Sequence, residues 1–387
     1  MLAAPAWAAP LAKRLAQALA TPHVESSESA ALAVDLTTGK VVFARHPGLA
    51  LVPASNEKLA ITYAALVRLG PAFRFRTEVL GEGKRDGHVW RGNLVLCGYG
   101  DPTLDTFGLK RLAAQLKTSG IRAVSGSVIG DESFFDARRM VDGWKASFFI
   151  QESPPLSALT INRGRIKGIV AEYPALATAR RFREILEARG IDVAGGVELR
   201  PAAPDAFALA SLYSEPLADI VRFMDHESDN FTAELLLKEL GAVVVGKGTS
   251  SAGAKVVVQT LADANVPLAG VRIVDGSGLS SSDRLTVRAL VGILRAAWLD
   301  PTIRMSIWRA LPVAGVSGTL EHRLQRLPAR GLVRAKTGTT NVSSSLSGFV
   351  GARYAFAVVQ NGHPVWAWYA REAQDRFVEA LAAEARR

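Results

Sequence analysis

The sequence predicts a mixed α/β fold of the α+β type, in which helices flank one antiparallel sheet and a small α/β domain is inserted. Two observations carry this prediction. A helix and a β-hairpin begin the chain, helices fill its middle, and strands followed by a helix end it, so both ends can build one sheet. Between residues 74 and 205 the pattern changes to short strand-like pieces that alternate with glycines, which indicates a second, smaller core.

The N-terminal part predicts a helix, a hairpin and a buried helix. Leucines recur at helical spacing over residues 10–20, and residues 29–35 alternate as a strand does. A Thr-Thr-Gly turn then leads into a return strand from residue 41. The helix expected over residues 56–69 is apolar nearly all round, and such a helix is buried in the middle of a domain.

Residues 74–205 predict an insertion into a main domain that is formed by residues 10–73 and 206–387. Within the insertion, strands are expected over residues 76–80, 93–96 and 124–130, and helices over residues 109–119 and 180–189. Its acids lie in the segments Gly-Asp-Pro-Thr-Leu and Gly-Asp-Glu-Ser-Phe-Phe-Asp, and we interpret them as turn and cap residues rather than metal ligands.

The rest of the main domain predicts helices and then strands. Ser214 and Pro216 predict a helix start with a capping serine and a proline in the first turn. This helix is expected to reach about Met224, and a break over residues 225–230 separates it from a helix over residues 231–240. The remaining elements are expected as helices over residues 252–264, 286–299 and 371–383 and strands over residues 331–337, 344–350 and 355–360.

Composition argues against several classes of protein. The 387-residue chain has a formal net charge of +10, but its arginines are scattered singly without a dense Lys/Arg run, so nucleic-acid binding is not expected. The single cysteine, Cys97, cannot form an intrachain disulfide, and the six histidines show no metal-binding spacing. We therefore expect no metal and no cofactor. No apolar run approaches the roughly 20 residues of a membrane-spanning helix.

The N-terminus resembles a targeting segment. Ala6-Trp7-Ala8 matches the small-x-small pattern of a signal-peptidase site, although a positive n-region and a long apolar h-region are missing. The segment is either the end of a signal peptide or an ordinary alanine-rich stretch. We favour the first interpretation, with residues 1–9 as a signal-peptide remnant, which predicts a periplasmic or extracellular protein.

Three short motifs point to chemistry: Ser55-Asn-Glu-Lys58 (S-x-x-K), Ser228-Asp-Asn230 (S-D-N) and Lys336-Thr-Gly-Thr339 (K-T-G-T). By accident, such a chain contains S-x-x-K roughly once, S-x-N in about half of cases and K-T-G in roughly one case in twenty. All three in this order is an accident of order one in several hundred. S-x-x-K opens the buried helix, S-D-N lies between two helices and K-T-G ends a strand, so we interpret the motifs together.

The residue types in these motifs suit catalysis by a nucleophilic serine. Ser55 and Lys58 are three residues apart at a helix start and therefore share one face. A serine hydroxyl needs a nearby base, and a lysine can serve when burial and a neighbouring cation such as Lys336 displace its proton. The N–H groups of Ser55 and Thr339 are expected to form an oxyanion hole, and Ser228 is expected to pass a proton to the leaving amine.

The same residues also have structural interpretations. Lys58 could be a snorkelling helix lysine, Ser228 and Asn230 could cap the helix that follows, and Lys336 could be an exposed strand residue. Taken singly these interpretations are at least as good as the functional ones, but taken jointly they rank well below them. Gly338 is expected to let an acyl peptide lie against the strand as an added β-strand would.

With these motifs the chain resembles the penicillin-binding protein and serine β-lactamase superfamily. Further segments extend the resemblance to the low-molecular-mass class C penicillin-binding proteins, the D-alanyl-D-alanine carboxypeptidase/endopeptidases (penicillin-binding protein 4 type, peptidase family S13). These segments are residues 51–58 (LVPASNEK), 98–104 (GYGDPTL), 130–136 (GDESFFD), 155–162 (PLSALTIN), 275–280 (DGSGLS) and the K-T-G strand. The resemblance spans nearly the whole chain.

The resemblance implies a penicillin-binding, β-lactamase-like transpeptidase fold and a serine-type D-Ala-D-Ala carboxypeptidase/endopeptidase that acts on peptidoglycan stem peptides. β-Lactam antibiotics are then expected to acylate the serine covalently. Position by position, it implies Ser55 as acylated nucleophile, Lys58 as its base, Ser228 as proton relay, Asn230 as holder of the substrate amide, Lys336 as the residue that shapes the field, and Thr337 and Thr339 as ligands of the terminal carboxylate.

The insertion departs from the pattern of larger family members, which carry a further subdomain after the Leu-Thr-Ile-Asn segment. Here Asn162 is followed closely by Tyr173-Pro174 and a helix, which leaves no room for that subdomain. We therefore expect a reduced insertion with intact transferase chemistry, and any contribution of the subdomain to polymer engagement is in question.

Two alternatives stay open beside a DD-peptidase. The first is a β-lactamase or esterase of the same fold. A class A enzyme needs a Glu-x-x-x-Asn segment between S-D-N and K-T-G, and none is found, so slow deacylation is expected. The second is a non-catalytic cell-wall-binding protein, which would tolerate the loss of Ser55, Lys58 or Lys336, yet all three are present. The sequence leaves open the balance of carboxypeptidase and endopeptidase activity and the oligomeric state.

Overall fold

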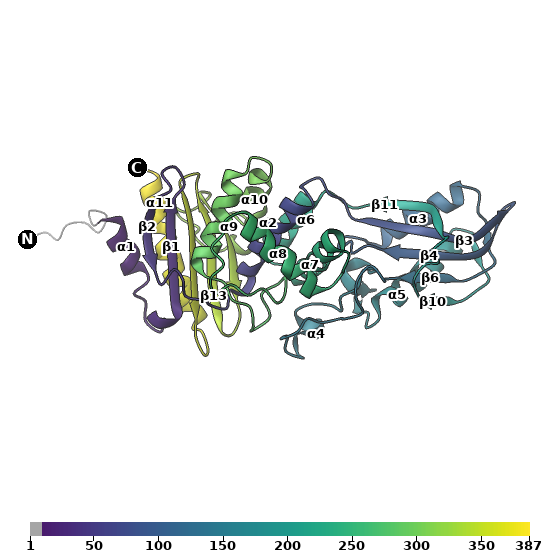
Figure 1. The fold of residues 1–387 in the computed structure, drawn as a ribbon, viewed down its shortest axis with the longest axis horizontal. Coiled ribbons are helices and arrows are strands. Elements are labelled where there is room, and N and C mark those ends of the chain that lie inside the picture. The colour runs from purple at the N-terminus through teal and green to yellow at the C-terminus, as the bar shows by residue number, and fades with distance from the viewer. Residues whose placement is uncertain (1–9) are drawn as a thin grey trace, which may run out of the picture. The chain divides into compact units, whose positions relative to one another are not determined.

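The computed structural model describes residues 10–387, so the signal-peptide interpretation of residues 1–9 lies outside the described residues. The chain forms two compact units (Figure 1). The first unit comprises the chain up to residue 71 with residues 221–229 and 254–387, and the second comprises residues 72–220 and 230–253.

The second unit is larger than the insertion that the sequence predicts. It takes in residues 206–220 and 230–253 in addition to residues 74–205, and the borders between the units pass through helices α6 and α8. The predicted domain borders therefore stay a prediction.

An antiparallel five-stranded sheet, in the order β12-β13-β14-β1-β2, forms the centre of the first unit. Strands from the two ends of the chain meet in it, because β1 pairs with β14 in a register that sets Ser29 opposite Gln360. This pairing confirms that both ends build one sheet. The strands are β1 (Ser29–Asp35), β2 (Val41–Arg45), β12 (Val333–Thr339), β13 (Ser343–Val350) and β14 (Tyr354–Asn361).

Helices cover both faces of this sheet (Figure 1). Strand alternation directs Ala31 and Ala33 of β1 to the face on which α1 and α11 pack, where they share a core with Phe377. The opposite face of β1, β13 and β14 packs against α9. The helices are α1 (Leu11–Ala18), α2 (Lys58–Arg68), α6 (Leu217–Glu227), α8 (Ser250–Asp263), α9 (Val287–Leu299), α10 (Arg304–Ala310) and α11 (Ala367–Ala385), with 3-10 turns η2 (Ser26–Glu28), η3 (Ala54–Glu57) and η5 (Gly318–Leu320).

The predicted central helix begins two residues earlier than expected, and it begins as a tighter turn. The 3-10 turn η3 precedes α2, and Ala54 starts it with a left-handed φ of 48°. Every residue of α2 from Lys58 to Leu66 is buried. This burial confirms the prediction of a helix enclosed in the domain, and it places Ser55 in the turn that leads into it.

The segment around the S-D-N motif is shorter than the predicted break. Helix α6 continues to Glu227, past the expected Met224, so only Ser228 and Asp229 separate it from the next helix. Ser228 turns the chain with a φ of 56°. The predicted cap by Ser214 is wrong, since its hydroxyl accepts a hydrogen bond from the Phe75 N–H (2.9 Å) and donates to the Glu215 carbonyl (2.7 Å).

The second unit is built on a mixed seven-stranded sheet whose main path is β10-β6-β4-β3-β11. Helices α3 and α5 pack on it and share a core that includes Leu112 and Phe182. Between Asn162 and Tyr173 the chain forms only η4 (Asn162–Gly164) and the two-residue strands β7 (Arg165–Ile166) and β8 (Ile169–Val170). The other elements are β3 (Arg76–Asp86), β4 (Val89–Gly98), β5 (Ala123–Val124), β6 (Val128–Asp131), β9 (Asp192–Val193), β10 (Val197–Leu199), β11 (Phe207–Tyr213), α3 (Thr106–Thr118), α4 (Phe148–Gln151), α5 (Pro174–Ala188) and α7 (Asn230–Val245).

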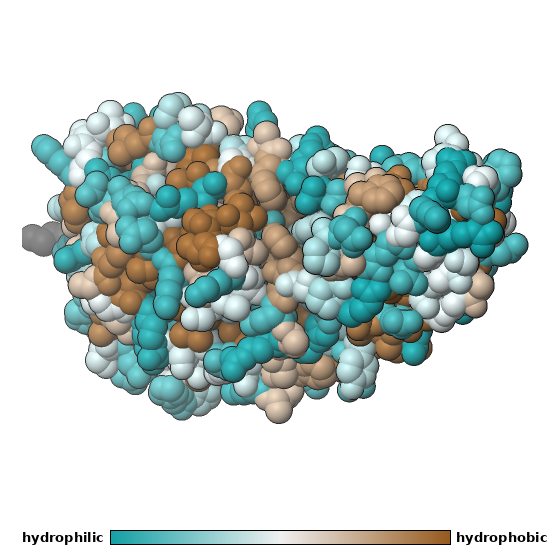
Figure 2. Space-filling view, turned by 45° about the vertical axis from the view of Figure 1, so that its right-hand side comes forward, coloured by the Kyte–Doolittle hydropathy of each residue, from teal (hydrophilic) through white to brown (hydrophobic). Residues whose placement is uncertain are grey.

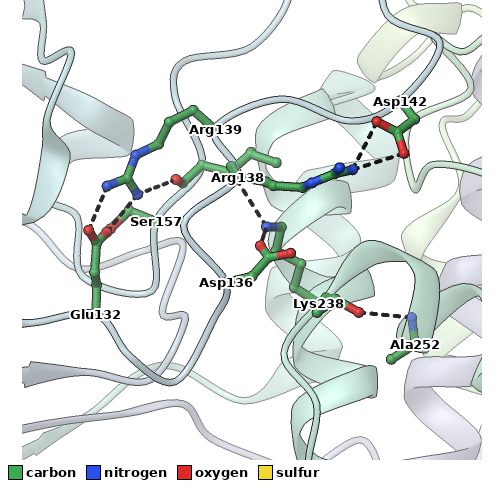
Figure 3. A network of polar contacts seen from close by, with 10 residues as sticks. Glu132, Asp136, Arg138, Arg139, Asp142, Ser157, Lys238 and Ala252 are labelled. Carbon is green, nitrogen blue, oxygen red and sulfur yellow. Dashed lines mark hydrogen bonds and ion pairs between the residues drawn. The ribbon is translucent and has the colours of Figure 1, made fainter. Parts of the chain in front are cut away.

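A polar network in the second unit contains two of the acids that the sequence assigned to turns (Figure 3). Glu132 forms a two-pronged ion pair with Arg139 (2.5 and 2.6 Å), and Asp136 forms an ion pair with the buried Lys238 of α7. Asp101 and Asp131 match the turn interpretation, because their carboxylates accept the N–H groups of Thr103 and Ser133 at 2.8 Å. The turn interpretation is therefore wrong for Glu132 and Asp136.

The surface of the first unit carries several apolar patches (Figure 2). A groove of about 460 Å³ lies beside the edge strand β2, where Leu32, Val291 and Leu299 are among its lining residues. This groove shares no residue with the motifs that predict chemistry. Within residues 10–387 no helix is both long enough and apolar enough to cross a membrane.

Candidate active site

The S-x-x-K motif forms the hydrogen bond that its spacing predicts. Lys58 Nζ donates to Ser55 Oγ at 3.0 Å, across the step from η3 into α2. Ser55 is half-buried and Lys58 is fully buried. A snorkelling lysine would place its ammonium group in water, so the burial rules out that structural alternative for Lys58.

Lys336 links the third motif to the second. Its Nζ donates to Ser228 Oγ at 2.8 Å and to the Thr337 carbonyl at 3.1 Å. Lys336 is 0% exposed, so it is not the exposed strand residue of the structural alternative. Two serine hydroxyls are thus each hydrogen-bonded to the amine of a buried lysine within the first unit.

Burial shifts the pKa values of Lys336 and of the nearby Asp225. Burial, with a smaller contribution from repulsion by Lys58 and against the attraction of Asp225, lowers the pKa of Lys336 to about 7. Burial likewise raises the pKa of Asp225, against the attraction of Lys336 and a hydrogen bond of 2.8 Å from Thr62. A buried amine that loses its proton near neutral pH can act as an acid or a base in proton transfer.

A loop over residues 275–280 holds Lys58 from the other side. The Ser277 carbonyl accepts a hydrogen bond from Lys58 Nζ at 2.8 Å. The buried carboxylate of Asp275 accepts the N–H groups of Ser277 (3.1 Å), Gly278 (2.6 Å) and Ser280 (2.7 Å), which fixes the course of the loop. The amine of Lys58 is therefore oriented by a hydroxyl and by a carbonyl whose position Asp275 determines.

Asp283 fixes the residues at which this loop begins. One of its carboxyl oxygens accepts the N–H groups of Val274 (2.6 Å) and Asp275 (3.3 Å). Burial, together with the charges of Asp275 and Glu57, raises the pKa of Asp283 far above its ordinary range. Asp283 is consequently neutral at pH 7.

Strand β12, which carries the K-T-G motif, lies against Ser55. A Cβ on Gly338 would come within 2.9 Å of the Ser55 nitrogen and 2.3 Å of Ser345 Oγ, so only glycine permits this approach. β12 is an edge strand, and its Ala335 N–H donates away from the sheet to the Pro312 carbonyl. Alternation along an antiparallel strand directs the N–H of Thr339 to the same side. The N–H groups of Ser55 and Thr339 thus belong to neighbouring segments, as an oxyanion hole requires.

Hydroxyl groups gather at the end of β12. Thr337 Oγ1 lies 2.7 Å from Thr319 Oγ1 of η5, and Thr339 Oγ1 accepts a hydrogen bond of 3.2 Å from Arg371 of α11. Thr337 is half-buried and Thr339 is exposed, so both can meet a ligand. These contacts fit the predicted role of the two threonines in binding a carboxylate.

Asn230, the remaining predicted site residue, belongs to the second unit. It begins α7, and its Nδ2 donates to the Glu152 carbonyl at 3.1 Å. Its role toward a substrate stays a prediction.

Four residues of the site were missed in the sequence. Asp225 carries no motif that marks it, although it lies three residues before Ser228 and therefore on the last turn of α6. Asp275 belongs to a segment that was noted only for its resemblance. Thr319 and Arg371 reach the cluster from distant segments, and no spacing rule could have found them. Among the described residues, no group of three or more His, Cys, Asp or Glu side chains is arranged to hold a metal ion.

Sequence comparison relates the chain to known peptidases. It matches the profile of the D-Ala-D-Ala carboxypeptidase 3 (S13) family over residues 11–175 and 166–384. The D-alanyl-D-alanine carboxypeptidase of Actinomadura sp. (strain R39) is 33% identical over 437 residues, which cover 89% of this chain and 80% of that protein. A carboxypeptidase of Mycobacterium tuberculosis is 34% identical over 356 residues, which cover 84% of this chain and 75% of the relative.

Structural comparison identifies the fold. The crystal structure of penicillin binding protein 4 from Haemophilus influenzae superposes with a TM-score of 0.84 at 22% identity, covering 97% of this chain and 99% of that one. A structure of the same protein complexed with a β-lactam superposes with a TM-score of 0.76. The chain therefore has the penicillin-binding fold that the motifs predict.

Proposed function

Because the chain belongs to the D-Ala-D-Ala carboxypeptidase 3 (S13) family, we propose that it releases the terminal D-Ala of peptidoglycan stem peptides through an acyl-enzyme on Ser55. The protein is a serine-type D-Ala-D-Ala carboxypeptidase with a penicillin-binding fold. The observation that carries the role of Ser55 is the 3.0 Å hydrogen bond from the fully buried Lys58 to its hydroxyl.

Acylation follows from the contacts of the two serines. Ser55 Oγ attacks the carbonyl carbon between the last two D-Ala residues as the amine of Lys58 takes the hydroxyl proton. The oxyanion that forms is held by the N–H groups of Ser55 and Thr339. Ser228 gives its proton to the leaving nitrogen and takes one from Lys336 Nζ, to which it is hydrogen-bonded. D-Ala departs as an amine, and an ester remains on Ser55.

Deacylation limits the reaction with β-lactams. Water attacks the peptidyl ester and restores Ser55, but the amine of an opened β-lactam ring stays attached to the acyl group. No Glu-x-x-x-Asn segment lies between Ser228 and Lys336, so we expect a long-lived β-lactam adduct rather than rapid turnover. The complex of the Haemophilus influenzae protein with a β-lactam supports the proposal that this class of molecule binds here.

The substrate points to the cell envelope as the place of action. Peptidoglycan lies outside the cytoplasmic membrane, so we propose a periplasmic or extracellular enzyme, in agreement with the interpretation of residues 1–9. We also propose that the insertion is reduced. In support, the alignment with the Actinomadura relative spans 437 positions, more than the 387 residues of this chain, so that relative contains segments without a counterpart here.

A labelled β-lactam tests the nucleophile. We expect one stable adduct on Ser55 by peptide mapping, no adduct on Ser55→Ala, and an unchanged adduct on the exposed-serine control Ser27→Ala. Release of D-Ala from a D-Ala-D-Ala peptide should disappear with the same variant. Label that persists on Ser55→Ala would refute the assignment, and steady hydrolysis of the β-lactam would favour the β-lactamase alternative.

A further inference from the structure

Arg371 is a cation placed at the hydroxyl cluster that ends β12. It lies in the second turn of α11, and its Nη2 donates to Thr339 Oγ1 at 3.2 Å. Its side chain is exposed, as is Thr339, while the neighbouring Thr337 and Thr319 hydroxyls lie 2.7 Å apart. A guanidinium group and three hydroxyl groups therefore come from three elements, β12, η5 and α11, to one place.

The guanidinium of Arg371 is not neutralised by the acids around it. Glu372 forms an ion pair with Arg376, and Asp375 forms one with Arg323 at 2.6 Å. Within residues 10–387, no carboxylate forms an ion pair with Arg371. An arginine has five N–H donors, and the bond to Thr339 uses one, so donors remain for a planar anion.

Lys336 alone is a poor source of charge for such an anion. It is buried, it donates to Ser228, and burial lowers its pKa to about 7. An arginine keeps its proton at every pH in which the enzyme could work, and its fork matches the two oxygens of a carboxylate.

We propose that Arg371 binds the terminal carboxylate of the substrate and so makes the enzyme specific for peptides that end in a free acid. This inference rests on the proposed function, in which Thr337 and Thr339 already face that carboxylate. Arg371 acts on recognition and not on the proton transfers at Ser55. Its contribution therefore depends on the negative charge of the substrate.

A matched pair of substrates isolates this contribution. One is an acylated D-Ala-D-Ala peptide with a free C-terminal carboxylate, and the other is the same peptide as its C-terminal amide. A charge-assisted hydrogen bond to a carboxylate is worth roughly 10- to 100-fold in kcat/KM. We expect Arg371→Gln to lose about that much on the acid, mainly through KM, and to stay within about twofold on the amide. Arg371→Lys should recover part of the loss.

The control variant is Arg376→Gln, which removes an exposed arginine from the same helix. It should leave both substrates unchanged. An equal loss on acid and amide, or no loss on the acid, would overturn the inference. The proposed function fails differently: wild-type protein would then release no D-Ala and would form no β-lactam adduct on Ser55, whatever residue stands at 371.

Discussion

Each unit of the molecule buries lysines, but it gives them different partners. In the first unit, Lys58 donates to the Ser55 hydroxyl and the Ser277 carbonyl, and Lys336 donates to the Ser228 hydroxyl. In the second unit, the equally buried Lys238 forms an ion pair with the Asp136 carboxylate (Figure 3). In the first unit each lysine amine therefore lies next to a serine hydroxyl, which can lose or gain a proton. In the second unit the lysine amine lies next to a carboxylate of opposite charge.

The difference shows how a buried lysine can serve either proton transfer or the stability of the fold. A hydroxyl or carbonyl partner compensates burial only in part, so the charged form of the lysine is destabilised and proton exchange near neutral pH becomes accessible. A carboxylate partner stabilises the charged form and keeps the proton in place. Burial alone therefore does not mark the lysines that we propose as catalytic; Lys58 and Lys336 differ from Lys238 in that each donates to a serine hydroxyl.

The largest effect is expected from replacing Lys58, the proposed base. Lys58→Met keeps the length and burial of the side chain but removes proton transfer, so acylation by a β-lactam should slow by about 10³-fold. Stopped-flow or quench measurement of the acylation rate constant checks this. Lys238→Met, examined in the same way, should acylate within about threefold of wild type. Equal losses in both variants would break the comparison.

The loop that orients Lys58 provides a matched pair of substitutions. Asp275→Asn replaces one acceptor of the loop N–H groups by an amide nitrogen, which should shift the Ser277 carbonyl and slow acylation by about 10-fold or more. Asp283→Asn imitates a carboxyl group that is already neutral, so acylation should change little. The rate constant and the dissociation constant of the preceding complex are measured separately. If Asp283→Asn slows acylation as much as Asp275→Asn does, the assignment of a neutral carboxyl group to Asp283 is wrong.

Replacing Lys238 should lower the free energy of unfolding. Lys238→Met leaves Asp136 without its cation, and we expect the free energy of unfolding to fall by about 2 kcal/mol, less than for a fully buried pair because Asp136 is 27% exposed. Adding Asp136→Asn should restore part of the loss. Urea unfolding of the two variants and the wild type measures this, and a double variant less stable than the single one would contradict the ion-pair assignment.

The smallest effect is expected for the stability of Lys336→Met. In the unfolded chain this lysine has a pKa near 10.5, and burial lowers it to about 7 in the folded protein. Below pH 7 both states bind the proton and the burial penalty is complete, whereas from pH 7 to 10.5 the folded state has released it and the penalty declines. Lys336→Met should therefore be more stable than wild type at pH 6 by about 1 kcal/mol.

The stabilisation by Lys336→Met should shrink toward pH 10, even though acylation is lost at every pH. Denaturant unfolding at pH 6, 8 and 10 follows this trend. A stability difference that stays constant from pH 6 to 10 would show instead that Lys336 remains charged in the folded protein throughout this range.

Much of the fold follows from local patterns in the sequence. The alternation of residues 29–35 and the apolar run of α2 predicted elements that the structure contains, and the motif order predicted which serines and lysines come together. These features depend on periodicity and on short-range geometry, both of which are written in consecutive residues.

The rest depends on tertiary contacts that no local pattern encodes. The turn η3 begins at Ala54, whose left-handed φ is imposed by packing and is not a preference of alanine. Ser214 has the sequence of a helix cap, but pairing with the Phe75 N–H prevails. Arg371 and Thr319 reach the site across 32 and 18 residues from Thr339 and Thr337, respectively, so only the folded chain reveals them.

The tight fit of Gly338 against Ser55 has a consequence for antibiotic resistance. Any side chain at this position would press on the nitrogen of Ser55 and on the Ser345 hydroxyl. If the natural peptide and β-lactams are both bound beside this strand, as we propose, a substitution at residue 338 that hinders the drug also displaces the Ser55 nitrogen that the peptide needs. Residue 338 then offers an inhibitor a contact that is hard to mutate away.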